Sequence, residues 1–476
     1  MTRLLKPNYD RSRLKPRLLH IGFGAFAKAH VMVFHDEMLH TEASDWGVVA
    51  TRLHSGIEDL DRLDQSDGLY SVGEMSDDDL RLRQVGVLTK TLHPRRDGPD
   101  SLLNQIAEPE LGVVTMTITE KGYCLSGGRL DLQNSGIRQD LISPASPETA
   151  IGVLVEGLSR RRNAGLSGLT ILSCDNLPEN GRLCQSAVLD FAEHRDPELA
   201  SWIRSKCRFP CSMVDRITPA MTEESFSKLA DALGYSDPNG VLCEPFRQWV
   251  IEDNFAGARP DWDLAGAEFI EDVAPFEEMK LRLLNGSHSF LAYLGALGDK
   301  ETIADCMEDP ILRAAVTRLM FDEQAPTLRV PQGVDIERYA KALLERFSNR
   351  ALHHKTTQIA SDGSQKLPQR LLAPVRQHLA EQHGWRLSSL AIAGWMLYCR
   401  GRSETGASLP VNDPLAARIS EISMRTDGDA YVHELLSLED VFGNDLPDNA
   451  DFVESISSAY RTLQDHGVLK SLSNSL

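Results

Sequence analysis

A lysine, an asparagine and a histidine follow closely on a glutamate after residue 275: Glu277, Lys280, Asn285 and His288. On an α-helix, at about 100° per residue, these four side chains share an arc of roughly 140° among several leucines. Apolar neighbours desolvate a lysine and lower its pKa, which suits Lys280 to proton exchange near neutral pH. Asn285 and His288 could hydrogen-bond a developing alkoxide or a neighbouring hydroxyl. An amphipathic helix whose polar side faces water is the alternative interpretation.

A glycine turn near the N-terminus has the spacing of a dinucleotide-binding fingerprint. The apolar run Leu18–Ile21 precedes Gly22 and Gly24, and Ala27 takes the third position of G-x-G-x-x-A. Gly22 permits the tight turn, and Gly24 lets the backbone approach a pyrophosphate. A helix is expected from this turn to about Leu39. The residues expected to contact the cofactor here are Gly22, Phe23, Gly24, Ala25 and Phe26. A glycine turn between any strand and helix is the alternative.

The strand after this helix bears on the choice between NAD and NADP. The fingerprint usually comes with an acidic residue at the end of this strand, where it accepts the ribose 2′-hydroxyl. Here Trp46–Ala50 runs into Thr51 and Arg52, and no acidic residue occurs before Glu58. Arg52 could instead meet a 2′-phosphate, and a solvated surface arginine is the alternative. The choice of cofactor therefore stays open at this point.

Polar residues also follow two further predicted strands. One, at residues 112–119, runs into Glu120 and Lys121, and another, at residues 168–173, is followed by Asn176. In open α/β sheets, ligands bind beyond the carboxyl ends of the strands, so these residues are candidates for a site. Asn176 could instead cap a helix or form a turn, which is the common role of asparagine before a helix.

The order of the expected elements indicates two domains. Strands at residues 17–21, 46–53, 112–119 and 168–173 alternate with helical stretches, which is typical of a parallel sheet. After about Trp262 the pattern becomes that of amphipathic helices, for example at residues 278–297, 310–323 and 336–347. The predicted fold class is therefore α/β, with a Rossmann-like dinucleotide-binding domain at residues 1–265 and a mostly α-helical domain at residues 266–476.

The composition excludes several classes of protein. The 476 residues include 50 Lys and Arg against 69 Asp and Glu, and the net charge of −19 disfavours a nucleic-acid partner. No segment has the roughly 18 consecutive apolar residues that span a bilayer, and the N-terminus lacks the apolar region of a signal peptide. We therefore expect a cytoplasmic protein with no membrane partner. The 8 cysteines lack the spacing of a zinc site or a disulfide framework, so we expect no metal.

Several segments together resemble the mannitol dehydrogenase and fructuronate reductase family, the long-chain polyol dehydrogenases. The stretch Lys-Leu-Arg-Leu-Leu-Asn-Gly-Ser-His, residues 280–288, is similar to the motif of that family. Other matching segments are at residues 20–26, 117–120, 173–176, 214–219, 246–253 and 362–366. The resemblance covers nearly the whole chain. It implies metal-independent hydride transfer between a nicotinamide and a sugar alcohol or sugar acid.

The resemblance also implies a role for each matching residue. Lys280 corresponds to the catalytic acid and base, and Asn176 and Asn285 to the amides that polarise the reacting oxygen. His288, Asp215 and Lys366 correspond to contacts with substrate hydroxyls or with another part of the substrate. Glu277 and Glu120 correspond to carboxylates along a water path through which the lysine exchanges its proton.

Two departures from the family pattern bear on the substrate. Polyol-specific members carry Arg and His before the Asp-Gly-x-x-Lys motif, whereas this chain has Gln358 and Ser361. Lys121 occurs where we expect glycine in mannitol enzymes and lysine in hexonate-oxidising members, and a cation there suits a substrate carboxylate. The predicted reaction is therefore the NAD-dependent interconversion of D-mannonate and D-fructuronate, with NADP not excluded. A polyol 2-dehydrogenase acting on mannitol or arabinitol is the alternative, and the oligomeric state stays open.

Overall fold

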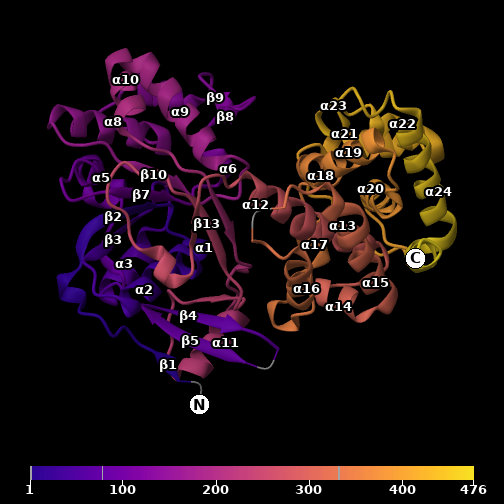
Figure 1. The fold of residues 1–476 in the computed structure, drawn as a ribbon, viewed down its shortest axis with the longest axis horizontal. Coiled ribbons are helices and arrows are strands. Elements are labelled where there is room, and N and C mark those ends of the chain that lie inside the picture. Colours follow the sequence, from indigo (N-terminus) through magenta and orange to yellow (C-terminus); the bar gives the residue numbers. More distant parts are fainter. Residues whose placement is uncertain (1–2, 78, 331–332) are drawn as a thin grey trace. The chain divides into compact units, whose positions relative to one another are not determined.

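The computed structural model describes residues 3–77, 79–330 and 333–476. It divides into two compact units, Met1–Ala274 and Pro275–Leu476 (Figure 1). The division falls after Ala274, a short way beyond residue 265, where the sequence analysis ends the first domain. Each unit is described separately.

A five-stranded parallel sheet forms the centre of the first unit, in the order β10-β7-β2-β3-β6. Its strands are β2 (Lys15–Ile21), β3 (Trp46–Thr51), β6 (Leu88–Leu92), β7 (Val113–Met116) and β10 (Thr170–Ser173). The four strands expected from the sequence are β2, β3, β7 and β10. β3 ends two residues and β7 three residues earlier than expected, because Arg52 and Thr117 already belong to polar turns. The predicted Rossmann-type α/β fold is confirmed.

Alternate residues of these strands face opposite sides of the sheet, since side chains along a strand alternate in direction. On one side, Leu18 and Val48 join a core with the apolar face of α2 (Val31–Thr41). On the other side, Leu19 and Val49 pack with a second group of helices. This second group comprises α5 (Pro99–Ile106), α8 (Ala150–Asn163) and α9 (Asn180–Arg195). Burial on both faces explains why these strands are almost continuously apolar.

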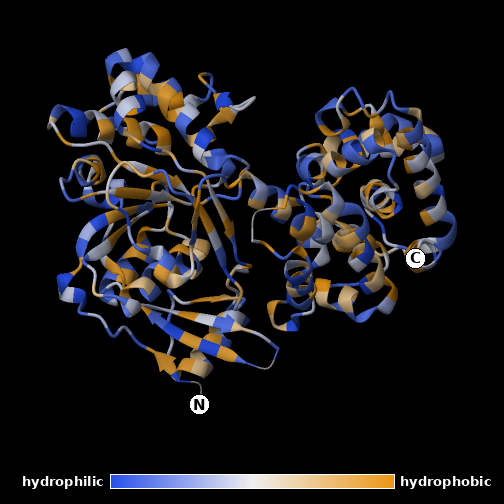
Figure 2. Ribbon diagram, in the orientation of Figure 1, coloured by the Kyte–Doolittle hydropathy of each residue, from blue (hydrophilic) through white to orange (hydrophobic). Residues whose placement is uncertain are grey.

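Three smaller sheets complete the first unit. The strands of the first are β1 (Leu4–Leu5), β5 (Leu80–Val85), β4 (Tyr70–Met75) and β12 (Val241–Cys243). The strands of the other two are β11 (Ser212–Asp215), β13 (Gln248–Glu252) and β14 (Glu268–Ile270), and β8 (Leu125–Ser126) and β9 (Arg129–Leu130). Figure 2 shows the hairpin of β4 and β5 alternating between orange and blue, as expected for strands with one apolar side.

The remaining helices of the first unit lie mostly in the connections between strands. They are η1 (Arg11–Arg13), α1 (Ala25–Ala29), α3 (Ile57–Gln65), α4 (Pro94–Asp97), α6 (Thr119–Gly122), α7 (Ser135–Ile142), α10 (Pro197–Lys206), α11 (Glu223–Leu233) and η2 (Trp262–Ala265).

The second unit is helical in its described part, apart from the isolated bridges Thr302↔Lys355 and Arg402↔Ser408. Its first elements are α12 (Ala274–Met279), η3 (Lys280–Gly286), α13 (Ser287–Leu297), α14 (Ile303–Glu308), α15 (Pro310–Arg318), η4 (Leu319–Gln324), η5 (Ala325–Thr327), α16 (Ile336–Phe347) and η6 (Arg350–Leu352). The later elements are α17 (Thr356–Ile359), α18 (Gly363–Leu367), η7 (Pro368–Leu372), α19 (Ala373–Glu381), α20 (Arg386–Tyr398), α21 (Ala416–Arg425), α22 (Gly428–Leu436), α23 (Glu439–Phe442) and α24 (Ala450–Ser473).

The core of the second unit is built around α13 and α20, which contact each other and are buried on nearly all sides. A helix that is apolar all round belongs in the interior of a domain. The long helix α24 covers α20. Of the three helices expected here, the one at residues 336–347 is found unchanged as α16, whereas the other two are interrupted by π-helices, η3 and η4.

No helix in the described part of the chain is long and apolar enough to cross a membrane. The eight cysteines are unpaired thiols, all buried except Cys124. Among the described residues, no group of three or more His, Cys, Asp and Glu side chains is arranged to hold a metal ion.

Candidate active site

The glycine turn lies between the ends of β3 and β7. The backbone N–H groups of Gly22 and Phe23 both donate to the carbonyl oxygen of Thr51, at 2.9 and 3.1 Å. Gly22 has a φ of +92°, and a Cβ there would lie 2.2 Å from the carbonyl oxygen of Thr117, so no other residue fits. A Cβ on Gly24 would find its nearest neighbour at 3.8 Å. One side of the turn is therefore closed by protein, and the other is open to a ligand.

The helix after this turn differs from the one expected. It breaks at His30, between α1 and α2, where the backbone has a φ of −114° and a ψ of −81°. The imidazole of His30 is fully buried, its Nε2 lies 2.9 Å from the carbonyl oxygen of Gln248, and its ring stacks on Phe26. Burial lowers the pKa of His30 to about 3, so the ring is neutral. The ring is thus anchored to β13 at the residue where the helix breaks.

Arg52 follows β3 directly and is held by an acidic residue. Its Nη1 donates to Oδ2 of Asp59 at 2.5 Å, and Arg62 pairs with the other carboxylate oxygen of Asp59. The side chain folds back over Gly56, whose φ is +85° and where a Cβ would overlap the guanidinium of Arg52. The expected arginine at this strand end is present, but it is already ion-paired.

Asp175 organises the backbone beyond β7 and β10. Its carboxylate accepts hydrogen bonds from the N–H groups of Ile118 and Thr119, at 3.0 and 2.8 Å, and from the hydroxyl of Tyr123 at 2.7 Å. Burial raises the pKa of Asp175 above its usual range. These bonds fix the turn into α6, in which Thr119 has a φ of +63°. Asp175 was not among the predicted site residues, although its place beside Asn176 at a strand end was a signal.

Asn180 links this turn to β11 and was also missed. Its amide nitrogen donates to the carbonyl oxygens of Asp175 and Ser212, at 2.9 and 2.7 Å, and its oxygen accepts from the N–H of Ser212 at 3.0 Å. Asn176 is exposed directly after Asp175, whereas Asp215, at the end of β11, is 4% exposed. The link therefore ties the segment that carries Asn176 to the strand that carries Asp215.

Two candidates on α6 lie at the surface of the first unit. Glu120 and Lys121 are both exposed. Their positions are fixed through the neighbouring Thr119 and Tyr123, which Asp175 holds. The structure thus brings Glu120, Lys121 and Asn176 to the carboxyl ends of β7 and β10, as expected.

In the second unit, Lys280 opens a π-helix. Lys280–Gly286 forms η3, so the α-helical arc predicted for Glu277, Lys280, Asn285 and His288 is wrong across this segment. In a π-helix, backbone bonds join residues i and i+5, and Lys280 and Asn285 have this spacing. Lys280 is 7% exposed and Asn285 8% exposed. The burial expected for the lysine is therefore confirmed, and a solvent-facing polar stripe is excluded.

Asn285 and His288 provide polar groups in an apolar setting. The amide nitrogen Nδ2 of Asn285 is buried and has no hydrogen-bond partner in the described structure. Since an unpaired buried donor is costly, this nitrogen is suited to a ligand oxygen. The ring of His288 lies 4.3 Å from that of Phe347 and 5.4 Å from that of His354. Burial, followed by the charges of nearby cations, lowers the pKa of His288 well below its usual range.

Two cations lie near Asn285 and His288. Lys366 donates to the carbonyl oxygens of Ile359 and Ser361, at 3.2 and 2.5 Å. Arg370 is 3.4 Å from the carbonyl oxygen of Asn285 and 3.2 Å from Oγ of Ser289. Burial lowers the pKa of Lys366 to about 8 and that of Arg370 to about 10. In the described part of the chain, neither forms an ion pair. Lys366 was among the predicted site residues, whereas Arg370 was not, because it lies beyond the motif that ends at Lys366.

The residues of the first unit fit a dinucleotide. The open side of Gly24 leaves room for a pyrophosphate close to the backbone, and the end of β3 is the usual place for the ribose hydroxyls. A Rossmann-type domain with such a turn, followed by a helical domain with a buried lysine and an unpaired amide, defines a class of protein, a dinucleotide-dependent dehydrogenase.

Comparisons with known proteins agree with the assignment to the dehydrogenases. The model of the mannitol dehydrogenase Rossmann domain matches residues 16–264, and that of the mannitol dehydrogenase C-terminal domain matches residues 272–464. D-mannonate oxidoreductase of Escherichia coli strain K12 is 49% identical over 466 residues, covering 97% of this chain and 96% of that protein. Polyol:NADP oxidoreductase of Gluconobacter oxydans strain 621H is 36% identical over 414 residues, covering 86% and 85%.

A solved structure is similar over the same extent. The ternary complex of Pseudomonas fluorescens mannitol 2-dehydrogenase with NAD and D-mannitol superposes with a TM-score of 0.88 at 36% identity, covering 99% of this chain and 96% of that chain. This chain therefore belongs to the mannitol dehydrogenase family, as the sequence motifs indicated.

Proposed function

We propose that this chain interconverts D-mannonate and D-fructuronate with NAD as cofactor. The observation that carries the proposal is the pair of half-buried, desolvated cations, Lys366 and Arg370, beside Asn285 and His288. The charges of Asp362 and Asp413 act on Lys366, but in the described part of the chain neither cation forms an ion pair. A desolvated cation without an ion-pair partner is costly, and a substrate carboxylate would balance it. An uncharged hexitol offers no such group. The name of the Escherichia coli relative, D-mannonate oxidoreductase, supports the same substrate.

Lys280 is the proposed acid and base. The turn at Gly22 and Gly24 would hold NAD, which would supply the hydride acceptor for oxidation of the secondary alcohol and, as NADH, the hydride donor for reduction of the ketone. In the reductive direction, the ammonium of Lys280 donates a proton to the oxygen of the former ketone, and in oxidation the neutral amine removes it. The unpaired Nδ2 of Asn285 donates a hydrogen bond to this oxygen, and Asn176 is the proposed second amide. Glu277 and Glu120 are proposed to line the path by which Lys280 exchanges its proton with water.

The remaining candidates are proposed to hold the rest of the substrate. His288 and Asp215 bind hydroxyl groups, since a neutral imidazole and a carboxylate accept hydrogen bonds readily. Lys366 binds the carboxylate together with Arg370. The two carbonyl oxygens that accept from Lys366 fix the direction of its ammonium group. Lys121 is proposed as a further carboxylate contact from the first unit.

A substrate panel tests the proposal. D-mannonate, D-fructuronate, D-mannitol and D-arabinitol are compared under NAD and NADP by the absorbance of the reduced cofactor. We expect the highest kcat/KM with the two acids and NAD. A higher kcat/KM with mannitol or arabinitol would instead support a polyol 2-dehydrogenase, and two relatives are named mannitol 2-dehydrogenase.

One substitution tests whether Arg370 binds the substrate carboxylate. Arg370→Met should raise KM for D-mannonate about 10- to 100-fold, the usual effect of losing a charge-assisted hydrogen bond. The matched control is Gln369→Met, which changes the exposed neighbouring residue. If Arg370→Met leaves KM for the acid unchanged, the carboxylate is bound elsewhere, and the two cations no longer support a sugar acid as the substrate.

A further inference from the structure

Arg52 lies where the adenosine ribose of a dinucleotide is expected, the ribose that carries a 2′-hydroxyl in NAD and a 2′-phosphate in NADP. It follows β3, and the carbonyl oxygen of Thr51, one residue earlier, receives both N–H groups of the glycine turn. In dinucleotide-binding sheets, an acidic residue at this strand end binds the 2′-hydroxyl of NAD, and an arginine accommodates the 2′-phosphate of NADP. By residue type alone, Arg52 favours NADP.

The structure shows why residue type alone is insufficient. Asp59, in the first turn of α3, holds Arg52 through Oδ2 and Arg62 through Oδ1. Gly56 leaves the space into which the Arg52 side chain folds, because a Cβ at this position would lie 1.9 Å from Nη1 of Arg52. The guanidinium is therefore directed toward the helix and has its charge partly balanced.

A third cation belongs to the same cluster. Lys28, on α1, donates to the carbonyl oxygen of Asn239 at 2.9 Å and lies over the rings of Phe23 and Tyr70. Burial lowers its pKa to about 8, and the charge of Asp59 acts in the opposite direction, whereas that of Arg52 adds to the lowering. Asp59 thus lies among three cations, and Asp237 is a second carboxylate whose charge acts on Lys28.

We propose that Asp59 sets the preference for NAD over NADP by holding Arg52 in an ion pair and by placing a negative charge where a 2′-phosphate would bind. This inference rests on the dinucleotide part of the proposed function and not on the identity of the sugar. A phosphate monoester carries about two negative charges near neutral pH, so a carboxylate at this place repels it. Without that carboxylate, Arg52 and Arg62 can both turn to the phosphate and bind it through paired N–H groups.

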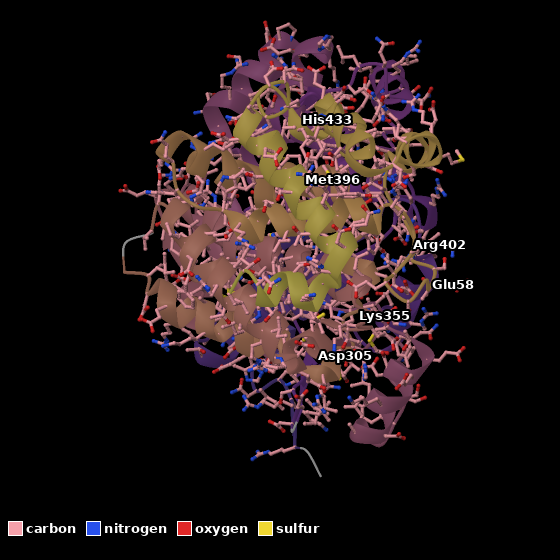
Figure 3. All side chains as sticks on the ribbon, turned by 90° about the vertical axis from the view of Figure 1, so that its right-hand side faces the viewer. Glu58, Asp305, Lys355, Met396, Arg402 and His433 are labelled. Carbon is pink, nitrogen blue, oxygen red and sulfur yellow. The ribbon has the colours of Figure 1, made fainter. Side chains whose placement is uncertain are left out.

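The test measures binding of NAD and NADP to the full chain by calorimetry, without any sugar substrate. Asp59→Asn, which is nearly isosteric, should tighten NADP binding about 10- to 100-fold and change NAD binding by less than about threefold. The matched control is Glu58→Gln, which removes one negative charge from the adjacent exposed position on the same helix, labelled in Figure 3. This control should change the ratio of the two affinities by less than about threefold.

A double substitution identifies the group that is released. Arg52→Met in the Asp59→Asn background should abolish the gain in NADP affinity while leaving NAD binding in place. An unchanged ratio in Asp59→Asn, or a gain that survives Arg52→Met, overturns the proposal. A loss of NAD affinity without a gain for NADP would mean that Asp59 itself holds the ribose, which also overturns it.

Binding by Asp59→Glu and turnover of D-mannonate distinguish failure of this inference from failure of the proposed function. Asp59→Glu retains the charge and should retain the preference for NAD, which separates the effect of charge from that of altered folding. If NAD binds with the expected preference but no sugar acid is turned over, the proposed substrate fails and this inference stands. If D-mannonate is oxidised but Asp59→Asn leaves the preference unchanged, only this inference fails.

Discussion

The proposed carboxylate contact at Lys366 predicts a pH dependence of substrate affinity. Burial, followed by the charge of Arg370, lowers the pKa of Lys366 from 10.5 to about 8. This difference corresponds to about 3 kcal/mol by which the folded protein disfavours the ammonium. The ammonium is present below about pH 8 and can bind a carboxylate, whereas above that pH the amine is neutral. Affinity for D-mannonate should therefore be constant at lower pH and fall by up to about tenfold per pH unit above it.

The assay must separate binding from the proton transfer at Lys280. D-mannonate and NADH are both in the reduced form and cannot react with each other, so calorimetric titration of D-mannonate into the complex with NADH reports affinity alone. Lys366→Arg should shift the decline to higher pH, since the neighbouring guanidinium of Arg370 keeps a pKa of about 10, above that of Lys366. Lys366→Met should give weak binding that changes little with pH. A flat profile in the unmodified protein, or an equal decline in Lys366→Arg, would refute the reasoning.

The effect of Lys366 on folding stability has the opposite pH dependence to its expected effect on substrate affinity. Because the pKa of Lys366 is lower in the folded protein, the unfolded chain binds more protons between about pH 8 and pH 10.5. Stability rises with pH wherever the unfolded state binds more protons. The contribution of Lys366 to stability therefore increases across the window in which its contribution to substrate affinity is lost.

Three other substitutions give sharp expectations. Lys280→Ala should lower kcat about 10²- to 10⁴-fold without weakening NAD binding, and near-normal turnover would exclude this lysine as the acid and base. Asn285→Ala should lower kcat about 10²- to 10³-fold. Its melting temperature should change little, because the amide nitrogen has no partner to lose, and a large fall in stability with normal kcat would assign it a structural role. Gly22→Ala should lose NAD binding in calorimetry and destabilise the fold by about 1–3 kcal/mol, from the positive φ and the contact with Thr117. Retained affinity would show that the turn is not part of the cofactor site.

The central sheet and the glycine turn could be predicted from the sequence for a simple reason. Their strands are buried on both faces and are therefore continuously apolar, and the turn at Gly22 tolerates only glycine. The break at His30 was not predicted, and the buried ring at this residue contacts the carbonyl oxygen of Gln248, more than two hundred residues away in the chain. Local pattern carries no information about such a partner.

The candidate site was predictable as residue types but not as contacts. The motifs that predicted the site by their spacing contain Lys280, Asn285, His288 and Lys366. Arg370 lies outside these motifs, and only the fold brings it to Ser289 and the backbone of Asn285. Arg52 is the opposite case, because its residue type suggested a phosphate contact, whereas the structure pairs it with Asp59.

The π-helical register of η3 brings the side chains of Lys280 and Asn285 toward the same side of the helix. At about 100° per residue, five α-helical steps rotate a side chain by about 140°, which would turn Asn285 away from the side of Lys280. The i→i+5 bonding of η3 largely removes this rotation. Two further π-helices, η4 and η7, contact η3, although π-helices account for well under about 1% of residues in proteins.

These three segments meet around Gly286. A Cβ on this residue would lie 2.9 Å from the carbonyl oxygen of Arg370 and 3.5 Å from Nε2 of Gln324. Gln324 is fully buried, and neither atom of its amide has a hydrogen-bond partner in the described structure. An amide left in this state costs folding free energy, as does the π-helical register itself. Such costs are typical of functional sites, and here they occur where the register must bring a lysine, an unpaired amide and an arginine into one region.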